Sequence, residues 1–214
     1  MKNDMNQEFK IFSDIVCHSY HMYRQYCCLY ENNDQRLALL EEIAHHFFYD
    51  LQGMWIERVF LDICKLTDPA EQRNNKNMTL DHWVKKLDGQ LIASEKEKID
   101  EATTICHKKR NIIVNVRSKI IAHIDYNVAI KKELLGKIKI EKEDIQEFYD
   151  NVQIIMNIIS DKLGRGPAPI NFVAQKDAED LVYNLKKAIH YDQLFESNPK
   201  KSYEERKQWK YKDA

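Results

Sequence analysis

The scarcity of helix-breaking residues limits the fold of this chain more than any other feature. Its 214 residues include only five glycines and four prolines. So few breakers favour long helices over a turn-rich β structure. Hydrophobic residues make up 43% of the chain and charged residues 31%, which is enough for a core and for a solvated helical surface. We therefore expect an all-α helical bundle.

The spacing of apolar residues divides the chain into elements. Apolar positions that recur every three or four residues predict helices over about residues 4–29, 34–66, 94–123, 143–163 and 176–195. Shorter helices are expected at 79–87, where Thr79 is the predicted N-cap, and at 128–135. The run EQRNNKNM is predicted to be a polar loop, GRGPAP a break, and 197–214 a charged tail. We expect a single domain spanning residues 1–214.

Each long helix has an apolar stripe that we expect to face the core. The predicted stripe of segment 4–29 is Phe9, Phe12, Val16, Tyr20 and Tyr23. That of segment 143–163 is Ile145, Phe148, Val152, Ile155 and Ile159. The predicted stripe of segment 34–66 is Leu37, Leu40, Ala44, Phe47, Leu51 and Met54. That of segment 176–195 is Leu181, Leu185 and Ala188.

Charge and cysteine usage bear on location. The formal net charge is −1 and the pI about 6.7, so the total charge does not indicate a nucleic-acid-binding protein. The five cysteines form no CxxC pair, which fits reduced thiols in a reducing compartment. The sequence MKNDMNQEFK lacks the apolar core of a signal peptide, and no apolar run reaches the ~20 residues that span a bilayer. We expect a cytoplasmic protein without membrane association.

Metal and nucleotide signatures are weak or missing. A di-metal helical bundle needs two Glu-x-x-His copies, and only Glu42 with His45 supplies one. Asp14, His18 and His21 share one helix face, but three ligands from one helix make a poor tetrahedral site. The sequence contains no HExxH, P-loop or dinucleotide fingerprint. We therefore expect neither a metal nor a cofactor.

The run RSKIIAH contains the candidate catalytic pair, Arg117 and His123. Histidine transfers protons near neutral pH, and an arginine fork stabilises charge that develops on phosphate. The run from Lys108 to Lys119 contains no acidic residue. Its Lys108, Lys109, Arg110 and Lys119 form a basic strip that would hold flanking phosphates. The alternative remains open that these are a helix-terminal histidine, a surface arginine and a solvated helix face.

Two stretches resemble the AbiU-like branch of the HEPN superfamily, which comprises bacterial abortive-infection proteins. They are LDICKLTDPAEQRNNKNMTL (61–80), with the LTDPA segment at 66–70, and VRSKIIAHID (116–125). The resemblance covers about residues 30–165, and it implies a HEPN-type helical bundle with additional N-terminal and C-terminal helices. It further implies a homodimer in which the Arg and His motifs of both protomers meet, and an RNA substrate.

The resemblance assigns Arg117 and His123 to the motif and Asp125 to the acid that follows it. Ser118 stands where many relatives have Asn, and Asp125 stands where some have a modifiable Tyr. The sequence therefore predicts a metal-independent endoribonuclease in phage defence or in toxin–antitoxin growth control, with a cognate antitoxin or defence partner as a further expected ligand. The alternative is a catalytically silent HEPN module that dimerises or binds a partner.

Overall fold

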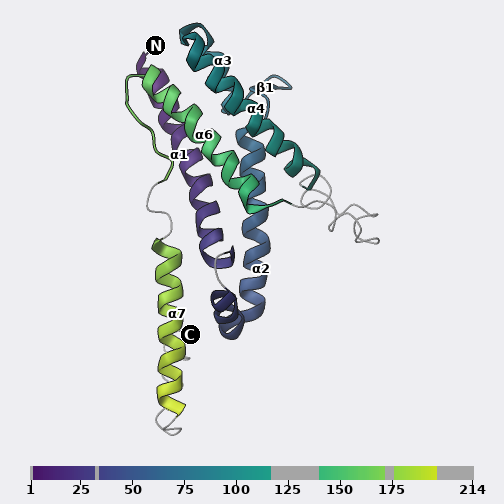
Figure 1. Cartoon of the computed structure of the whole chain (residues 1–214), viewed down its shortest axis with the longest axis vertical. Helices are drawn as coiled ribbons and strands as arrows, with labels where there is room; N and C mark the ends of the chain where they lie inside the picture. Colours follow the sequence, from purple (N-terminus) through teal and green to yellow (C-terminus); the bar gives the residue numbers. More distant parts are fainter. Residues whose placement is uncertain (1, 32–33, 117–139, 172–175, 197–214) are drawn as a thin grey trace. The chain divides into compact units, whose positions relative to one another are not determined.

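The protein is helical along nearly all of its described length, as predicted. The computed structural model describes residues 2–31, 34–116, 140–171 and 176–196. The long helices are α1 (Lys2–Tyr26), α2 (Asp34–Leu66), α4 (Ala93–Val116), α6 (Lys142–Lys162) and α7 (Lys176–Glu196) (Figure 1). Shorter elements are the π-helical turn η1 (Cys27–Glu31), strands β1 (Glu71–Gln72) and β2 (Asn75–Lys76), helix α3 (Leu80–Leu87) and the 3₁₀ turn η2 (Asp88–Gln90).

The chain forms two compact units. Unit 1 comprises residues 1–23 and 53–173, and unit 2 comprises residues 24–52 and 174–214. Both α1 and α2 contribute residues to each unit. Within the described ranges, no helix combines the length and the apolar character that crossing a bilayer requires.

Unit 1 has the larger core, which includes the predicted stripes of α1 and α6. The α1 and α6 stripes are buried throughout, as are Ile99, Ala102, Cys106 and Ile113 of α4. Helix α3 begins at the predicted N-cap, where the Thr79 hydroxyl accepts a hydrogen bond from the His82 backbone N–H (3.3 Å). Its Trp83 is fully buried and meets the ring of Phe9 edge-on.

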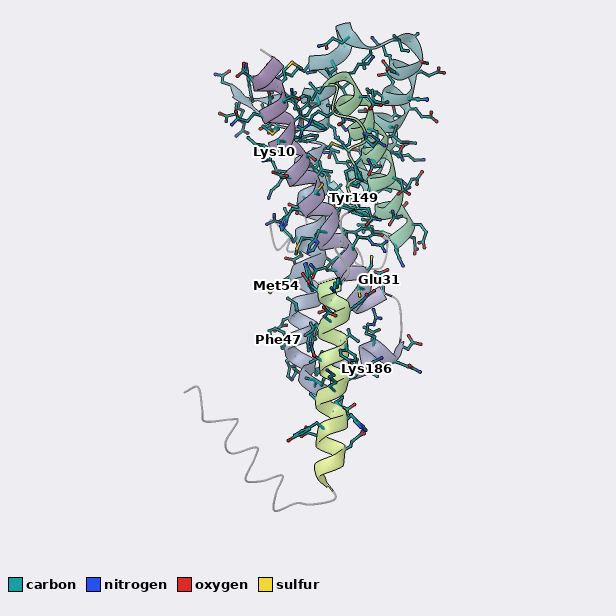
Figure 2. All side chains as sticks on the ribbon, turned by 90° about the vertical axis from the view of Figure 1, so that its left-hand side faces the viewer. Lys10, Glu31, Phe47, Met54, Tyr149 and Lys186 are labelled. Atoms are coloured by element: carbon teal, nitrogen blue, oxygen red, sulfur yellow. The ribbon has the colours of Figure 1, made fainter. Side chains whose placement is uncertain are left out.

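A tyrosine cluster joins α1 to α6 inside unit 1. The hydroxyls of Tyr149 and Ser19 are 2.6 Å apart and hydrogen-bonded, and both residues are buried. The ring of Tyr23 stacks on that of Tyr149, with 5.4 Å between centroids; Tyr149 is labelled in Figure 2. Because a buried hydroxyl needs a partner, this contact fixes how α1 and α6 align.

The described part of unit 2 consists of the last residues of α1, η1, the first part of α2, and α7. The turn η1 packs against α7, and the Tyr30 hydroxyl donates to the backbone carbonyl of Phe48 (3.0 Å). The Arg36 guanidinium donates to the carbonyl of Cys28 and contacts its sulfur. Burial raises the pKa of the Tyr30 hydroxyl to about 12, so this group stays protonated and remains a donor.

Two predicted stripes are wrong in part: Leu40 of α2 is buried as predicted, but other members of the stripes are exposed. Phe47 and Met54 of α2 are 63% and 65% exposed (Figure 2), while Leu39 and Phe48 are buried. Ala44 has non-helical backbone angles (φ −158°, ψ 71°), so the helical repeat loses its phase there and residues before and after it do not share one face. In α7 the buried positions are Ala178 and Val182, whereas Leu181 is exposed. Adjacent apolar stripes on α7 made the sequence pattern ambiguous.

The predicted polar loop after α2 contains a small hairpin. Strands β1 and β2 pair antiparallel, with Glu71 opposite Lys76 and Gln72 opposite Asn75. The two turn residues, Arg73 (φ 49°) and Asn74 (φ 69°), both lie in the left-handed region. Two such residues in succession are what a tight type I′ hairpin turn requires.

Candidate functional site

The second half of α4 leads into the predicted motif. Arg117, Lys119, His123 and Asp125 lie outside the described residues, so their assignment stays a prediction. Lys108, Lys109 and Arg110 lie on α4, which is described to Val116. The local structure around the motif is therefore defined by what these three residues and the start of α6 contact.

Lys109 joins α4 to the first turns of α6. Its Nζ is 2.7 Å from Asp144 Oδ1 and also contacts Glu147. Only 12% of the Lys109 side chain is exposed. The hydrogen bonds to Asp144 and then Glu147 raise the pKa of Lys109, and the Lys109 ammonium lowers that of Asp144 against the opposing effect of burial. Both groups are therefore held in their charged forms.

Further contacts hold the N-terminus of α6. Asp144 Oδ2 accepts a hydrogen bond from the Glu141 backbone N–H (3.1 Å), which satisfies a donor that precedes the first helical turn. The Tyr23 hydroxyl donates to the Lys142 carbonyl (3.1 Å). Helices α4 and α6 pack along each other (Figure 1). The residues that flank segment 117–139 on both sides are thus tied together and to α1.

Arg110 joins α4 to the LTDPA segment. Its Nη2 donates to Asp68 Oδ1 at 3.1 Å, while its buried Nε has no hydrogen-bond partner within the described ranges. The neighbouring Thr67 is buried, and its hydroxyl donates to the Ile63 carbonyl (2.7 Å). Asp68 is therefore the point at which LTDPA meets the helix that precedes RSKIIAH.

The three basic residues of α4 differ in their surroundings. Lys109 and Arg110 are each bound to carboxylates, whereas Lys108 is exposed and forms no ion pair with a described residue. Sequence analysis did not predict the roles of Asp68 and Asp144. They lie 42 and 35 residues from their partners, and no periodic pattern connects positions so far apart.

Two histidine–carboxylate pairs involve residues of α3. His107 of α4 is 2.9 Å from Asp81, and His82 is 2.7 Å from Glu8, which Lys86 also contacts. The larger influence on Glu8 is burial, which raises its pKa, but the hydrogen bonds from Lys86 and His82 together lower it. These pairs connect α3 to α1 and α4.

The described residues contain no group of three or more His, Cys, Asp or Glu side chains that could hold a metal ion. The segment GRGPAP, residues 164–169, lies just after the end of α6. The N–H groups of Gly164 and Arg165 donate to the carbonyls of Asp161 and Ser160 at the end of α6. Beside this segment lies an open groove of about 410 Å³, and Lys10 is one of the residues that line it. The segment serves as a helix C-cap.

These features define an all-α protein in which the segment LTDPA and the helix that leads into RSKIIAH are joined by an ion pair. The family model for AbiU2 of the HEPN proteins matches residues 7–184. Because this match covers most of the chain, the protein belongs to the AbiU2 family of HEPN proteins, which supports a HEPN-type role related to abortive infection. No curated protein and no solved structure matches the chain.

Proposed function

We propose that this protein is a metal-independent endoribonuclease that acts in the cytoplasm, in phage defence or in toxin–antitoxin growth control. One observation carries the proposal. The AbiU2 match spans residues 7–184 and therefore includes the run RSKIIAHID at 117–125, which contains the residue types that metal-free RNA cleavage needs.

Each motif residue has a role in the proposed reaction. His123 accepts the proton of the ribose 2′-hydroxyl, whose oxygen attacks the adjacent phosphorus. Arg117 stabilises the charge that grows on the phosphate oxygens, and Asp125 orients His123. The bond to the 5′-oxygen breaks, that oxygen takes up a proton from water, and His123 releases to water the proton that it accepted. The products are a 2′,3′-cyclic phosphate and a 5′-hydroxyl, so the proton balance closes without a metal-bound water.

Flanking cations would hold the RNA backbone. Lys108 is exposed and forms no ion pair with a described residue, so it and Lys119 are the first candidates. Lys109 and Arg110 already form ion pairs with Asp144 and Asp68. Each would have to release its carboxylate before it could bind a phosphate of the RNA. We expect these two to contribute less to RNA binding.

We also propose a composite site in a homodimer. In a continuous helix, six residues turn through roughly 600° and rise about 9 Å. Arg117 and His123 would then point about 120° apart and could not easily reach one phosphate. A two-fold axis sets residue i of one chain against residue j of the other. In this arrangement Arg117 of one protomer acts with His123 of its partner.

The decisive experiment compares the wild type with His123→Ala in a bacterial host. His190→Ala is the matched control, because it removes an exposed histidine from α7. We expect the wild type and the control to stop growth and to generate new RNA ends. His123→Ala should do neither at equal protein level. Intact RNA and normal growth with abundant wild-type protein would refute the proposed activity.

A further inference from the structure

We propose that the hairpin formed by β1 and β2 is an RNA-binding element that binds single-stranded RNA near the described end of α4. The inference rests on the proposed function in taking RNA as the ligand. Its carrying observation is the juxtaposition of an exposed, cationic, amide-rich hairpin tip with the helix that leads into RSKIIAH.

The hairpin tip retains an unfavourable backbone conformation. Type I′ turns favour Asn-Gly because both central residues need positive φ. Here Arg73 and Asn74 occupy these positions, with φ of 49° and 69°. Asn tolerates this region, but Arg rarely adopts it. Arg73 places a guanidinium in the turn at a position where Gly would fit without strain. Because strained backbone positions cluster at functional sites, we infer that the Arg73 side chain has a function.

The chemistry of the tip matches a nucleic-acid strand. All six residues from 71 to 76 are exposed. Arg73 and Lys76 form no ion pair with any residue in the described ranges, although Glu71 lies opposite Lys76 in the hairpin, whereas Lys109 and Arg110 each bind a carboxylate. An arginine fork binds phosphate oxygens in pairs. The side-chain amides of Gln72, Asn74 and Asn75 can donate to and accept from the exposed edges of unpaired bases.

The same residues are poorly suited to other ligands. None of residues 71–76 is a large apolar side chain, so the hairpin lacks the aromatic or aliphatic anchors that dominate protein–protein interfaces. The strands are only two residues long each, which leaves little edge for pairing with another strand. Phosphate and base edges are the ligands that remain.

The base of the hairpin is fixed to α4. The Asn77 side chain donates to the Pro69 carbonyl and its backbone N–H donates to the Ala70 carbonyl, both at 2.8 Å. Asp68, one residue earlier, holds Arg110 of α4. From Arg110 to the last residue of α4, Val116, the helix rises about 9 Å. The hairpin projects from this region of unit 1 (Figure 1), within reach of a strand of a few nucleotides bound near the end of α4.

The test measures RNA binding without cleavage. All proteins carry His123→Ala, and a fluorescent 12-nucleotide single-stranded RNA reports binding by anisotropy across a range of salt concentrations. Arg73→Gly combined with Lys76→Gln removes both charges, and Gly preserves the turn because it adopts positive φ freely. The matched control, Lys85→Gln with Lys98→Gln, removes two exposed charges from α3 and the start of α4.

Two lost phosphate contacts should reduce the slope of log K against log salt by about 1.4, and should raise Kd about 25-fold at 0.1 M salt. The control pair should change the slope by less than about 0.3 and Kd by less than about twofold. Arg73→Lys with Lys76 intact should restore most of the affinity, which a purely structural role of the turn would not require. Circular dichroism verifies that each variant is folded.

The outcomes separate this inference from the proposed activity. Cleavage by the wild type, with hairpin variants that bind and cut RNA normally, would overturn the inference and leave the proposed function intact. If RNA binding depends on the hairpin but the wild type does not cleave RNA, the hairpin inference stands and the proposed nuclease activity is refuted. No RNA binding at all would overturn the hairpin inference as well.

Discussion

Removing the Lys109 ammonium is the sharpest test of how the region beside the motif is held together. Lys109→Met keeps most of the apolar stem and deletes the charge that joins α4 to Asp144 and Glu147. The first carboxylate is 24% exposed and the second 50%, so the remaining charges are partly solvated. We therefore place the cost between that of an exposed pair, up to about 1 kcal/mol, and that of a broken buried pair, about 3–5 kcal/mol.

A value of about 2 kcal/mol follows, and it should lower the melting temperature by about 4–8 °C for a chain of this size. Lys108→Met is the matched control: it removes the same charge from the neighbouring, exposed position and should change stability by less than about 0.5 kcal/mol. Thermal unfolding followed by circular dichroism measures both. The RNA-cleavage rate of Lys109→Met should also fall, because α4 and α6, the helices on either side of segment 117–139, lose the ion pairs that Lys109 forms between them.

The effect should depend on pH in a defined direction. The folded-state pKa of Asp144 is lowered, so its contribution is present above the ordinary carboxyl pKa of about 4 and is lost as pH falls through the folded value. The pKa of Lys109 is raised, so its contribution is present below about pH 10 and is lost as pH rises through the folded value. The difference between wild type and variant should be full at neutral pH and shrink towards pH 3. An equal melting temperature at pH 7, or an undiminished difference at pH 3, would refute this reasoning.

Three further predictions concern the tyrosine cluster, the chemistry and the assembly. Tyr149→Phe should cost about 1–2 kcal/mol in chemical denaturation, because the buried Ser19 hydroxyl loses its partner; an unchanged midpoint would contradict this. Cleavage should survive EDTA and leave 2′,3′-cyclic phosphate ends, whereas strict Mg²⁺ dependence with 3′-hydroxyl ends would exclude the mechanism. A mixed dimer of Arg117→Ala and His123→Ala chains should regain part of the activity that both parents lack. A dead mixed dimer, with its formation shown by tagged pull-down, would exclude pairing across the two-fold axis.

Local sequence signals were sufficient where the structure depends on local periodicity. The stripes of α1 and α6 and the N-cap at Thr79 were all predicted, because each reflects contacts within a few turns of one helix. The α2 stripe was wrong beyond Ala44. The non-helical backbone angles of Ala44 change the phase of the helical repeat, and no glycine or proline at that position signals the change. The hairpin was missed because Arg73 replaces the glycine that usually marks such a turn.

The candidate site was predictable in kind but not in its surroundings. Arg117 and His123 stand out by residue type and by the family likeness, and they remain predictions. The carboxylates that hold Lys109 and Arg110 come from distant segments, and only the folded chain brings them together. The RNA-binding role of this run of cations stays a prediction, and two of its three described members, Lys109 and Arg110, pair with carboxylates that the sequence pattern does not reveal.

The divided composition of unit 2 has a consequence for synthesis on the ribosome. Its first segment, 24–52, is separated from its second, 174–214, by the 121 residues from 53 to 173. At about 5–20 residues per second, translation of that interval takes on the order of 6–24 s. Until α7 emerges, the surface of η1 that packs against it has no native cover. The nascent chain therefore exposes apolar surface for many seconds, which is long enough for chaperones to bind it, and a chain shortened before α7 keeps that surface exposed permanently.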